Sequence, residues 1–427
     1  MGKYTIYNDD IIDKEIDNRL AIIVSTIVGS LGNNVYSIIL AGGYGRGEGS
    51  VIKENGSVRL LKDFDICVVT HNDVNYIATK NLLDIIYNKL RLDNAENSLF
   101  RHSKFAIDLK FINKNNINYP DIWFYDLKNS LVLYGEDITR HITYNSNDIP
   151  LSSGMRLLFE KVTGLLGHFN YYMLYKGVNG DQRTNLIYEC MKTYIEIGTA
   201  LCILYRRYVP SYRERVKIIK SLVEDKHLDD LIIHLPDLLY KIEYSTQFKF
   251  MPDFNAIDNP ISLWFKTKHD LIKVILFYLK NYLDFGQDDL SILDIMSKKL
   301  SKIYYKPMLN AFKINKKINI PVSILNILYQ LYTNIKYIKN IKKEEGELCM
   351  KPLINNMFIS PALKFYPAGI YILLSLEKDG SVNNSFMEKA RRILSDLLPI
   401  DRTETWEDMR VLYLKTYKYY VDPTLLK

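Results

Sequence analysis

The residues with the clearest chemical potential in this chain are a glycine-rich run and two aspartates that follow it. The run reads Gly42-Gly43-Tyr44-Gly45-Arg46-Gly47-Glu48-Gly49, and Asp63-Phe64-Asp65 comes after a short insertion. Glycine accepts positive φ and lets the backbone approach a phosphate, so successive N–H groups can point at an anion. Carboxylates two residues apart on a strand share one face, where a cation relieves their repulsion. Mg²⁺ takes oxygen ligands and is often shared with substrate phosphates, so the pattern predicts a metal–nucleotide site.

Two better-known phosphate-binding patterns do not fit this run. A P-loop requires Gly-Lys-Ser/Thr after its glycines, and none follows here. The dinucleotide fingerprint G-x-G-x-x-G fails too, because counting from Gly43 and Gly45 its third glycine falls on Glu48. An ordinary glycine-rich turn would account for the glycines alone, but not for Asp63 and Asp65 in the next strand.

Apolar runs on both sides of the glycines predict the strands that must position these residues. Val35 to Leu40 leads into the glycines, and Ile66 to Thr70 follows the aspartates. A third strand is predicted over Phe105 to Ile112, where apolar residues alternate with Ala106, Asp108 and Lys110. Aspartate is depleted in strands and costly when buried unpaired, so Asp108 is a further candidate site residue. The alternative is a solvated residue on an edge strand.

Two helices are predicted around these strands. Apolar residues recur at helical spacing from Ile12 to Leu31, with Asp9 or Asp10 as the cap and Gly32 as the end. We expect this helix to pack on the sheet. A second helix is predicted over Asp73 to Leu92.

These motifs together resemble the active-site signature of the polymerase-β-like nucleotidyltransferase superfamily. The resemblance covers residues 35 to 112, and the glycine run is closest to that of the uridylyltransferases that modify the PII signalling protein. The separation of about twenty residues between Gly43 and Asp63 is longer than is usual in the superfamily. We interpret Val51 to Lys62 as an inserted hairpin, because Asn55-Gly56 at its middle favours a tight two-residue turn.

The resemblance implies a metal-dependent enzyme that moves a nucleoside monophosphate from a triphosphate such as ATP to an acceptor hydroxyl, with release of pyrophosphate. Asp63 and Asp65 would hold two Mg²⁺ ions, or Mn²⁺ in their place. Asp108 would complete the metal site and is a candidate for the base. The residues assigned to the nucleotide on the glycine run are Gly42, Gly43, Tyr44, Gly45 and Arg46. The resemblance also implies that a helix over Asp121 to Gly135 closes the domain.

The resemblance leaves the acceptor open between a protein side chain, a small molecule and an RNA end, since a motif does not set a substrate. The sequence of the glycine run, which is closest to that of enzymes that modify a protein, favours a protein acceptor. The alternative readings are a nucleotide- or RNA-binding protein with a decayed catalytic centre, and a nucleic-acid-binding protein that works through its basic helices.

The length of 427 residues predicts two or three domains. We expect an α+β fold, with a catalytic domain of mixed sheet and helices over residues 1–145 and a large all-α region over 150–427. The polar run from Tyr144 to Ser153 is the predicted linker. A further division of the helical region is expected near 252–260 or 342–352.

The two parts differ in charge. Residues 1–150 carry 16 Lys and Arg against 19 Asp and Glu, a net charge of −3; the whole chain is +7, so residues 151–427 carry +10. This excess predicts an anionic partner for the helical part, or else a lysine-rich solvated surface. The candidate phosphate contacts there are Arg183, Lys192, Arg206 and Arg207, with Lys192 assigned to the nucleotide; the alternative for each is an ordinary surface residue.

The cysteines, the N-terminal segment and the length of the apolar runs indicate the cellular compartment. Cys67, Cys190, Cys202 and Cys349 show no metal-ligand spacing, and we interpret them as reduced core residues. Acidic residues interrupt the N-terminal segment, so we expect no signal peptide there. No apolar run reaches the roughly 18 residues that a membrane span needs. We therefore expect a cytoplasmic protein without a membrane partner.

Overall fold

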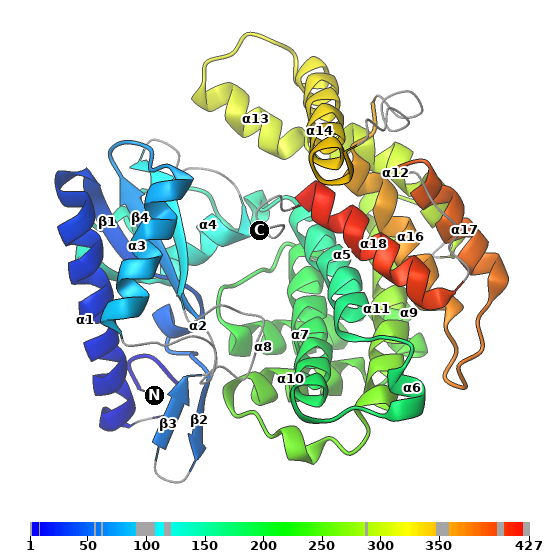
Figure 1. Cartoon of the computed structure of the whole chain (residues 1–427), viewed down its shortest axis with the longest axis horizontal. Helices are drawn as coiled ribbons and strands as arrows, with labels where there is room; N and C mark the ends of the chain where they lie inside the picture. The colour runs from blue at the N-terminus through cyan, green and yellow to red at the C-terminus, as the bar shows by residue number, and fades with distance from the viewer. Residues whose placement is uncertain are drawn as a thin grey trace. The chain divides into compact units, whose positions relative to one another are not determined.

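A computed structural model gives the fold of the chain (Figure 1). It describes residues 2–7, 9–54, 57–60, 63–90, 107–114, 121–286, 289–346, 358–398 and 405–421. The chain forms two compact units: the first contains Met1–Ile149, Arg206–Ser221 and Leu239–Ala256, and the second contains Pro150–Tyr205, Leu222–Leu238 and Ile257–Lys427. A small mixed sheet lies near the N-terminus and many helices follow it, so the predicted α+β class holds at this level.

A four-stranded sheet in the order β5-β4-β1-β6 forms the centre of the first unit. Its strands are β1 (Val35–Leu40), β4 (Phe64–Thr70), β5 (Ile107–Asn113) and β6 (Leu131–Gly135). β1 is antiparallel to both β4 and β6, whereas β4 and β5 are parallel. The three predicted strands are present, although Phe105 and Ala106 of the third lie outside the described residues and Asp63 precedes β4 instead of lying in it. The strands that carry Asp65 and Asp108 are neighbours.

The helix predicted over Asp121 to Gly135 is wrong in its second half. A short helix α4 (Ile122–Asp126) and a 3-10 turn η3 (Leu127–Asn129) lead into strand β6. Short apolar runs do not separate helix from strand by periodicity alone. Here tertiary pairing decides, because β6 supplies the backbone partners of β1, with Leu131 opposite Leu40.

Helices α1 (Asp10–Leu31) and α3 (Tyr76–Lys89) cover one face of the sheet. The Asp9 carboxylate caps α1 by accepting from the N–H groups of its first turn, and Gly32 ends it with φ of +53°, as predicted. The other face packs on α4, η3 and the 3-10 turn η4 (Ile138–His141). The first core contains Ile12, Ile16, Leu20, Ile38, Leu40, Phe64, Ile66, Val68 and Ile107, and the second contains Ile39, Cys67, Val69, Leu127 and Ile138.

The predicted inserted hairpin is present. Strand β2 (Val51–Glu54) pairs antiparallel with β3 (Ser57–Leu60), from Val51 opposite Leu60 to Glu54 opposite Ser57. Its turn residues, Asn55 and Gly56, lie outside the described residues.

Beyond β6 the described residues form helices, apart from an isolated bridge between Leu376 and Val382. Those of more than one turn are α5 (Leu151–His168), α7 (Gly180–Leu204), α8 (Tyr212–Glu224), α9 (Asp229–His234), α10 (Leu238–Phe250), α11 (Pro260–Leu283), α12 (Ser291–Ile303), α13 (Lys306–Asn315), α14 (Val322–Glu345), α16 (Pro361–Ser375), α17 (Asn384–Ser395) and α18 (Trp406–Val421). Short turns beyond β6 are η5 (Ser146–Asp148), α6 (Met173–Lys176) and η6 (Phe254–Ala256); before and after β1 lie η1 (Gly32–Asn34) and the one-turn helix α2 (Gly42–Gly45). In the part of the chain that is described, no helix combines the length and apolar character that crossing a bilayer requires.

The second unit is built around α5, α7, α11, α16 and α18. Phe169 stacks on Trp264 with ring centroids 3.9 Å apart, and Lys161 pairs with Glu189 at 2.7 Å in the buried interior. Cys190 and Cys202 are buried in this unit, as Cys67 is in the first unit. The remaining cysteine, Cys349, lies outside the described residues.

Two segments of the predicted helical region belong to the first unit: residues 206–221, with most of α8, and 239–256, with most of α10. The chain changes unit at Ile149, inside the predicted linker, and again at Ala256, inside the predicted 252–260 boundary. Of the 342–352 boundary, only the end of α14 and Gly346 are described. Whether these compact units are independent domains stays a prediction.

Candidate active site

Strand direction brings the predicted site residues to one edge of the sheet. β1 ends at this edge, and its antiparallel neighbour β4 begins there, with Leu40 opposite Ile66. β5 runs parallel to β4 and therefore begins at the same edge. The glycine run follows β1 directly. Asp65 is the second residue of β4, and Asp108 is the second residue of β5. The fold thus gathers motifs that are far apart in the sequence.

Asp65 and Asp108 are direct partners across the parallel strands. Both side chains are half-buried, whereas Phe64 and Ile107, one residue earlier in each strand, are buried in the core under α1 and α3. Paired residues on neighbouring strands project to the same face. The predicted alternation of β5 is therefore confirmed over its described part, and the two carboxylates share one face.

Asp63 is half-buried just before β4. Burial raises the pKa of the Tyr87 hydroxyl to about 12, and the nearby charges of Asp84, Asp63 and Asp108 add to that rise. The charges of Asp63 and Asp108 therefore both raise the pKa of the same hydroxyl, which is on α3. Within the described ranges, no three His, Cys, Asp or Glu side chains form a ready metal-binding cluster.

Gly42 lies directly against the Asp65 carboxylate. Its φ is +63°, and a Cβ built at this position would lie 1.8 Å from Asp65 Oδ2. The preceding amide, Ala41 N, donates to the Asp65 carbonyl at 2.8 Å. Only glycine combines this backbone conformation with so close an approach. The turn and the carboxylate are thus fitted to each other.

Two other residues of the glycine run serve packing. Tyr44 is buried, donates to the Ser50 carbonyl at 2.7 Å and contacts Phe64 edge to face at 5.0 Å. A Cβ on Gly45 would lie 2.0 Å from the Leu40 carbonyl oxygen, so this position also needs glycine. Their assignment to nucleotide contacts stays a prediction.

Lys110 forms an ion pair with Asp108 on the same strand. Its Nζ lies 3.0 Å from Asp108 Oδ2 and 5.0 Å from the centroid of the Trp123 ring. The two charged side chains are 45% and 40% exposed. Such exposed pairs contribute about 0–1 kcal/mol. This pair partly neutralises the carboxylates, and a ligand could displace it at small cost.

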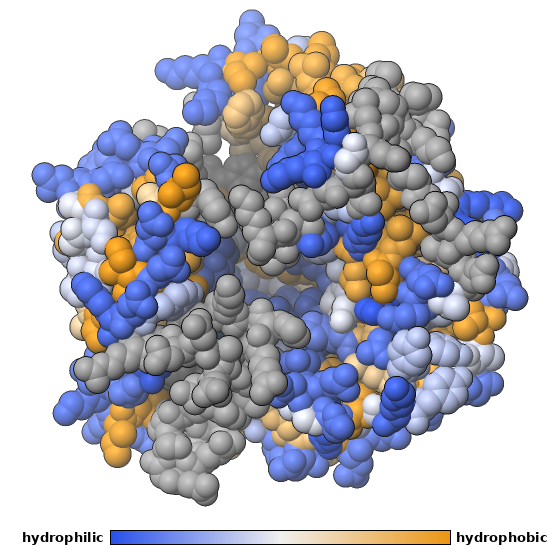
Figure 2. Space-filling model, in the orientation of Figure 1, coloured by the Kyte–Doolittle hydropathy of each residue, from blue (hydrophilic) through white to orange (hydrophobic). Residues whose placement is uncertain are grey.

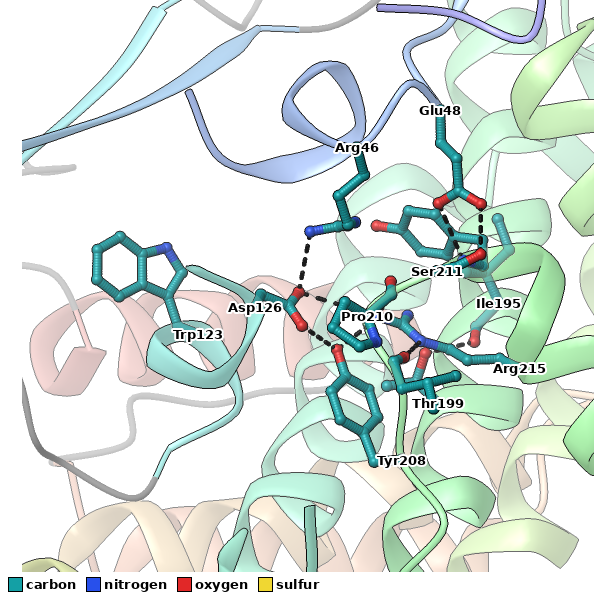
Figure 3. Close-up of polar contacts among 12 residues, drawn as sticks. Arg46, Glu48, Trp123, Asp126, Ile195, Thr199, Tyr208, Pro210, Ser211 and Arg215 are labelled. Carbon is teal, nitrogen blue, oxygen red and sulfur yellow. Dashed lines mark hydrogen bonds and ion pairs between the residues drawn. The ribbon is translucent and has the colours of Figure 1, made fainter. Parts of the chain in front are cut away.

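Arg46 points into the interior of the first unit (Figure 3). Its side chain is 5% exposed, and its guanidinium lies 3.4 Å from Asp126 Oδ2. Asp126 also accepts from the Tyr208 hydroxyl at 2.6 Å, and Arg215 donates to that hydroxyl at 2.5 Å. Arg46 is therefore part of an internal network that ties the glycine run to α4 and to residues 206–221. Its predicted contact with the nucleotide stays a prediction.

Glu48 caps the start of α8. Its carboxylate accepts from Ser211 Oγ at 2.7 Å, from Tyr212 N at 3.0 Å and from Arg213 N at 3.4 Å (Figure 3). Ser211 Oγ in turn accepts from Glu214 N at 3.3 Å, which is one of the two bonds of a capping box. A negative charge at a helix N-terminus satisfies free N–H groups and the helix dipole. The glycine run thus fixes α8 through its acidic residue.

Lys249 is a cation at the glycine turn that sequence reasoning missed. Its Nζ lies 3.4 Å from the Glu48 carbonyl oxygen and 4.5 Å from the centroid of the Tyr212 ring. A Cβ on Gly43 would be 3.2 Å from the same Nζ. No motif marks Lys249, which is separated from the glycine run by about 200 residues and reaches it only through the placement of α10.

The predicted basic contacts lie elsewhere. Arg206, with φ of +59°, donates to the carbonyls of Asn147 at 2.9 Å and Ile149 at 2.5 Å. Arg207 donates to Ser221 Oγ at 3.3 Å. Arg183 and Lys192 are on α7 in the second unit, so they are not among the residues that the first unit brings together.

Comparison with known proteins gives no relative: the chain matches no family model, no curated protein and no solved structure. Arguments about its activity therefore rest on the residues and the geometry described above.

Proposed function

We propose that this protein is a metal-dependent nucleotidyltransferase, which transfers a nucleoside monophosphate from a triphosphate to an acceptor hydroxyl. One observation carries the proposal. Asp65 lies against the positive-φ turn at Gly42 and is paired in register with Asp108 on the next strand. A phosphate-binding turn and two carboxylates on one face are the parts that this chemistry needs.

The donor set suits Mg²⁺. Asp63, Asp65 and Asp108 offer only carboxylate oxygens, which hard divalent cations prefer, and substrate phosphates commonly complete the coordination. The weak, exposed pair of Lys110 with Asp108 is not an obstacle to this role. When bound, Mg²⁺ would lower the pKa of the attacking hydroxyl and neutralise charge on the triphosphate.

The chain's own residues would position the reactants. Backbone N–H groups at Gly42 and Gly43 would face the phosphates, and Lys249 beside Gly43 would add a positive charge there. Asp108 would take the proton from the acceptor. Positioning and charge stabilisation account for most of the rate in phosphoryl transfer, so no covalent nucleophile is needed.

The buried ties behind the turn support the proposal indirectly. Arg46 and Glu48 fix the glycine run to Asp126 and to α8, and these bonds keep the turn in one conformation. A preorganised turn costs less to order when phosphate binds. In this proposal, Arg46 and Glu48 are positioning residues.

The acceptor is a protein side chain, an RNA end or a small molecule, and the similarity of the glycine run to the PII uridylyltransferases favours a protein. A nucleotide-binding protein with a decayed catalytic centre is the second candidate. The observation that favours it is the ion pair of Lys110 with Asp108, which partly neutralises this carboxylate without a metal.

The test is incubation with each labelled triphosphate and Mg²⁺ or Mn²⁺, with and without cell lysate. Wild type should label an acceptor, whereas Asp63→Asn with Asp65→Asn, and Asp108→Asn alone, should not. Asp73→Asn is the matched control, because Asp73 follows β4 at the opposite end of the strand. Full labelling by the double variant would remove the proposal. Binding of nucleotide without transfer in every reaction would favour the second candidate.

A further inference from the structure

Helix α14 of the second unit exposes a row of large apolar side chains. Exposed large apolar side chains cluster in residues 312–335, which hold eight of the 19 that occur among the described residues. On α14, Leu328 is 51% exposed and Tyr332 is 59% exposed. The full set in this stretch is Phe312, Ile314, Ile320, Ile324, Ile327, Leu328, Tyr332 and Ile335. Five of these residues, from Ile324 to Ile335, lie in α14, and their spacing puts them on one stripe of the helix.

The buried side of α14 is mixed: it holds the polar residues Asn326, Gln330, Thr333 and Asn334 beside the apolar Leu325, Tyr337, Ile338 and Ile341. Asn326 Nδ2 and Gln330 Nε2 both donate to the Ser301 carbonyl at 2.8 Å, and Asn340 Nδ2 donates to the Tyr419 carbonyl at 2.8 Å. Helices of globular proteins normally bury the apolar stripe and expose the polar one. Amide side chains that bond specific carbonyls fix the rotation of α14, so its apolar stripe is held outward.

Lysines surround this stripe. Residues 306–343 contain eight lysines and no Asp, Glu or Arg, so the segment alone supplies +8 in a part of the chain whose net charge is +10. The lysines exposed to solvent are Lys306, Lys316, Lys317, Lys336, Lys339, Lys342 and Lys343. Figure 2 shows hydrophobic and hydrophilic side chains side by side over α13 and α14, at the top of the view. We call this region the α13–α14 surface.

We propose that the α13–α14 surface binds anionic phospholipid bilayers, lying on them without crossing, in contrast to the sequence-based expectation of no membrane partner. A helix with an apolar stripe and lysines enters the headgroup region by burying the stripe, while its lysines contact acidic headgroups. No described helix needs to span the bilayer for this, and none is suited to do so.

Other occupants fit less well. A nucleic acid would use the lysines but not the aliphatic side chains of Ile324, Ile327 and Leu328, since bases stack on aromatic rings. A second copy would bring the same lysine-rich surface against itself, and like charges repel. Aliphatic and cationic side chains on one surface complement acidic lipid in both respects.

The test uses the full chain and sedimentation with vesicles of phosphatidylcholine alone or with phosphatidylglycerol. Binding should require the anionic lipid and should weaken as salt is raised. Lys336→Gln with Lys339→Gln and Lys342→Gln should weaken binding about fivefold for each lysine, or about a hundredfold together. Ile327→Ser with Leu328→Ser and Ile335→Ser should weaken it at least about tenfold.

Matched controls come from exposed positions of the first unit. Lys14→Gln with Lys80→Gln and Lys89→Gln, and separately Ile11→Ser with Ile85→Ser, should bind as wild type does. Thermal melts confirm that each variant is folded. No binding to anionic vesicles at low salt would overturn the proposal. So would RNA binding that depends on the lysines but not on the isoleucines, or a dimer without lipid that the serine variant abolishes.

Discussion

Removal of the Glu48 carboxylate should release the start of α8. Glu48 is 2% exposed, and its carboxylate accepts from Ser211 Oγ and from two backbone N–H groups. Loss of a helix cap costs about 0.5–2 kcal/mol. Leaving buried donors unsatisfied costs about 1–3 kcal/mol, and the two terms overlap. We expect Glu48→Ala to lower the free energy of unfolding of this region by about 2–4 kcal/mol.

Glu48→Gln separates the charge from the shape. The amide keeps one acceptor oxygen but turns an NH₂ group toward donors, so we expect a loss of about 1–2 kcal/mol. Glu214→Gln is the matched control in the first turn of α8. Glu214 pairs with Lys217 at the surface, where such a pair contributes about 0–1 kcal/mol.

The assay is amide hydrogen exchange on the peptide that contains residues 211–216, combined with urea unfolding. Exchange of this peptide should be about 30-fold faster or more in Glu48→Ala, since 1.4 kcal/mol corresponds to a factor of ten. If Glu48→Ala exchanged no faster than Glu214→Gln, the cap would not hold α8 and the reasoning would fail.

Three further predictions concern single sites. Gly42→Ala should lower the free energy of unfolding by about 1–2 kcal/mol because of the positive φ at this position alone. Its clash with Asp65 should also abolish nucleotide binding. Thermal melts and a binding assay test the two effects, and nucleotide binding equal to that of wild type would contradict the second. Lys161→Met should cost about 3–5 kcal/mol in urea unfolding because it leaves Glu189 buried and unpaired, whereas the double change Lys161→Met with Glu189→Met should recover most of the loss. Burial and the hydrogen bond to Asp17 raise the pKa of the Tyr4 hydroxyl to about 12. The stability that this neutral hydroxyl contributes is therefore complete below pH 10 and is lost as the pH rises toward 12. Unfolding at pH 9 and pH 11 should therefore show wild type losing about 1 kcal/mol more than Tyr4→Phe, and equal losses would refute the assignment.

The elements that the sequence predicted correctly are those that local patterns determine. The helix from Asp10 to Leu31 has six turns of apolar spacing and a cap at each end, and the β2–β3 hairpin has an Asn-Gly turn signal. The alternation around Asp108 gave the face of β5. β6 was missed because five apolar residues carry no period, and only its pairing with β1 makes it a strand.

The candidate site was predictable only where its chemistry is local. The glycines and carboxylates carry their own signal, and strand pairing then placed Asp65 opposite Asp108. The partners of Arg46 and Glu48 lie 80 or more residues away, without any repeated spacing to reveal them. The net charge of the helical part also did not show where its exposed positive charge lies. Several of its arginines form internal hydrogen bonds, whereas lysines of α13 and α14 are exposed.

We propose above all that Asp65 and Asp108 form a metal-dependent triphosphate site at the Gly42 turn. The most direct measurement is the dissociation constant of a non-hydrolysable triphosphate analogue, with Mg²⁺ and with a chelator. Wild type and Asp73→Asn should bind the analogue only with Mg²⁺, and Asp65→Asn with Asp108→Asn should lose at least about tenfold in affinity. Equal affinity in the double variant, or wild-type binding that ignores Mg²⁺, would contradict the claim.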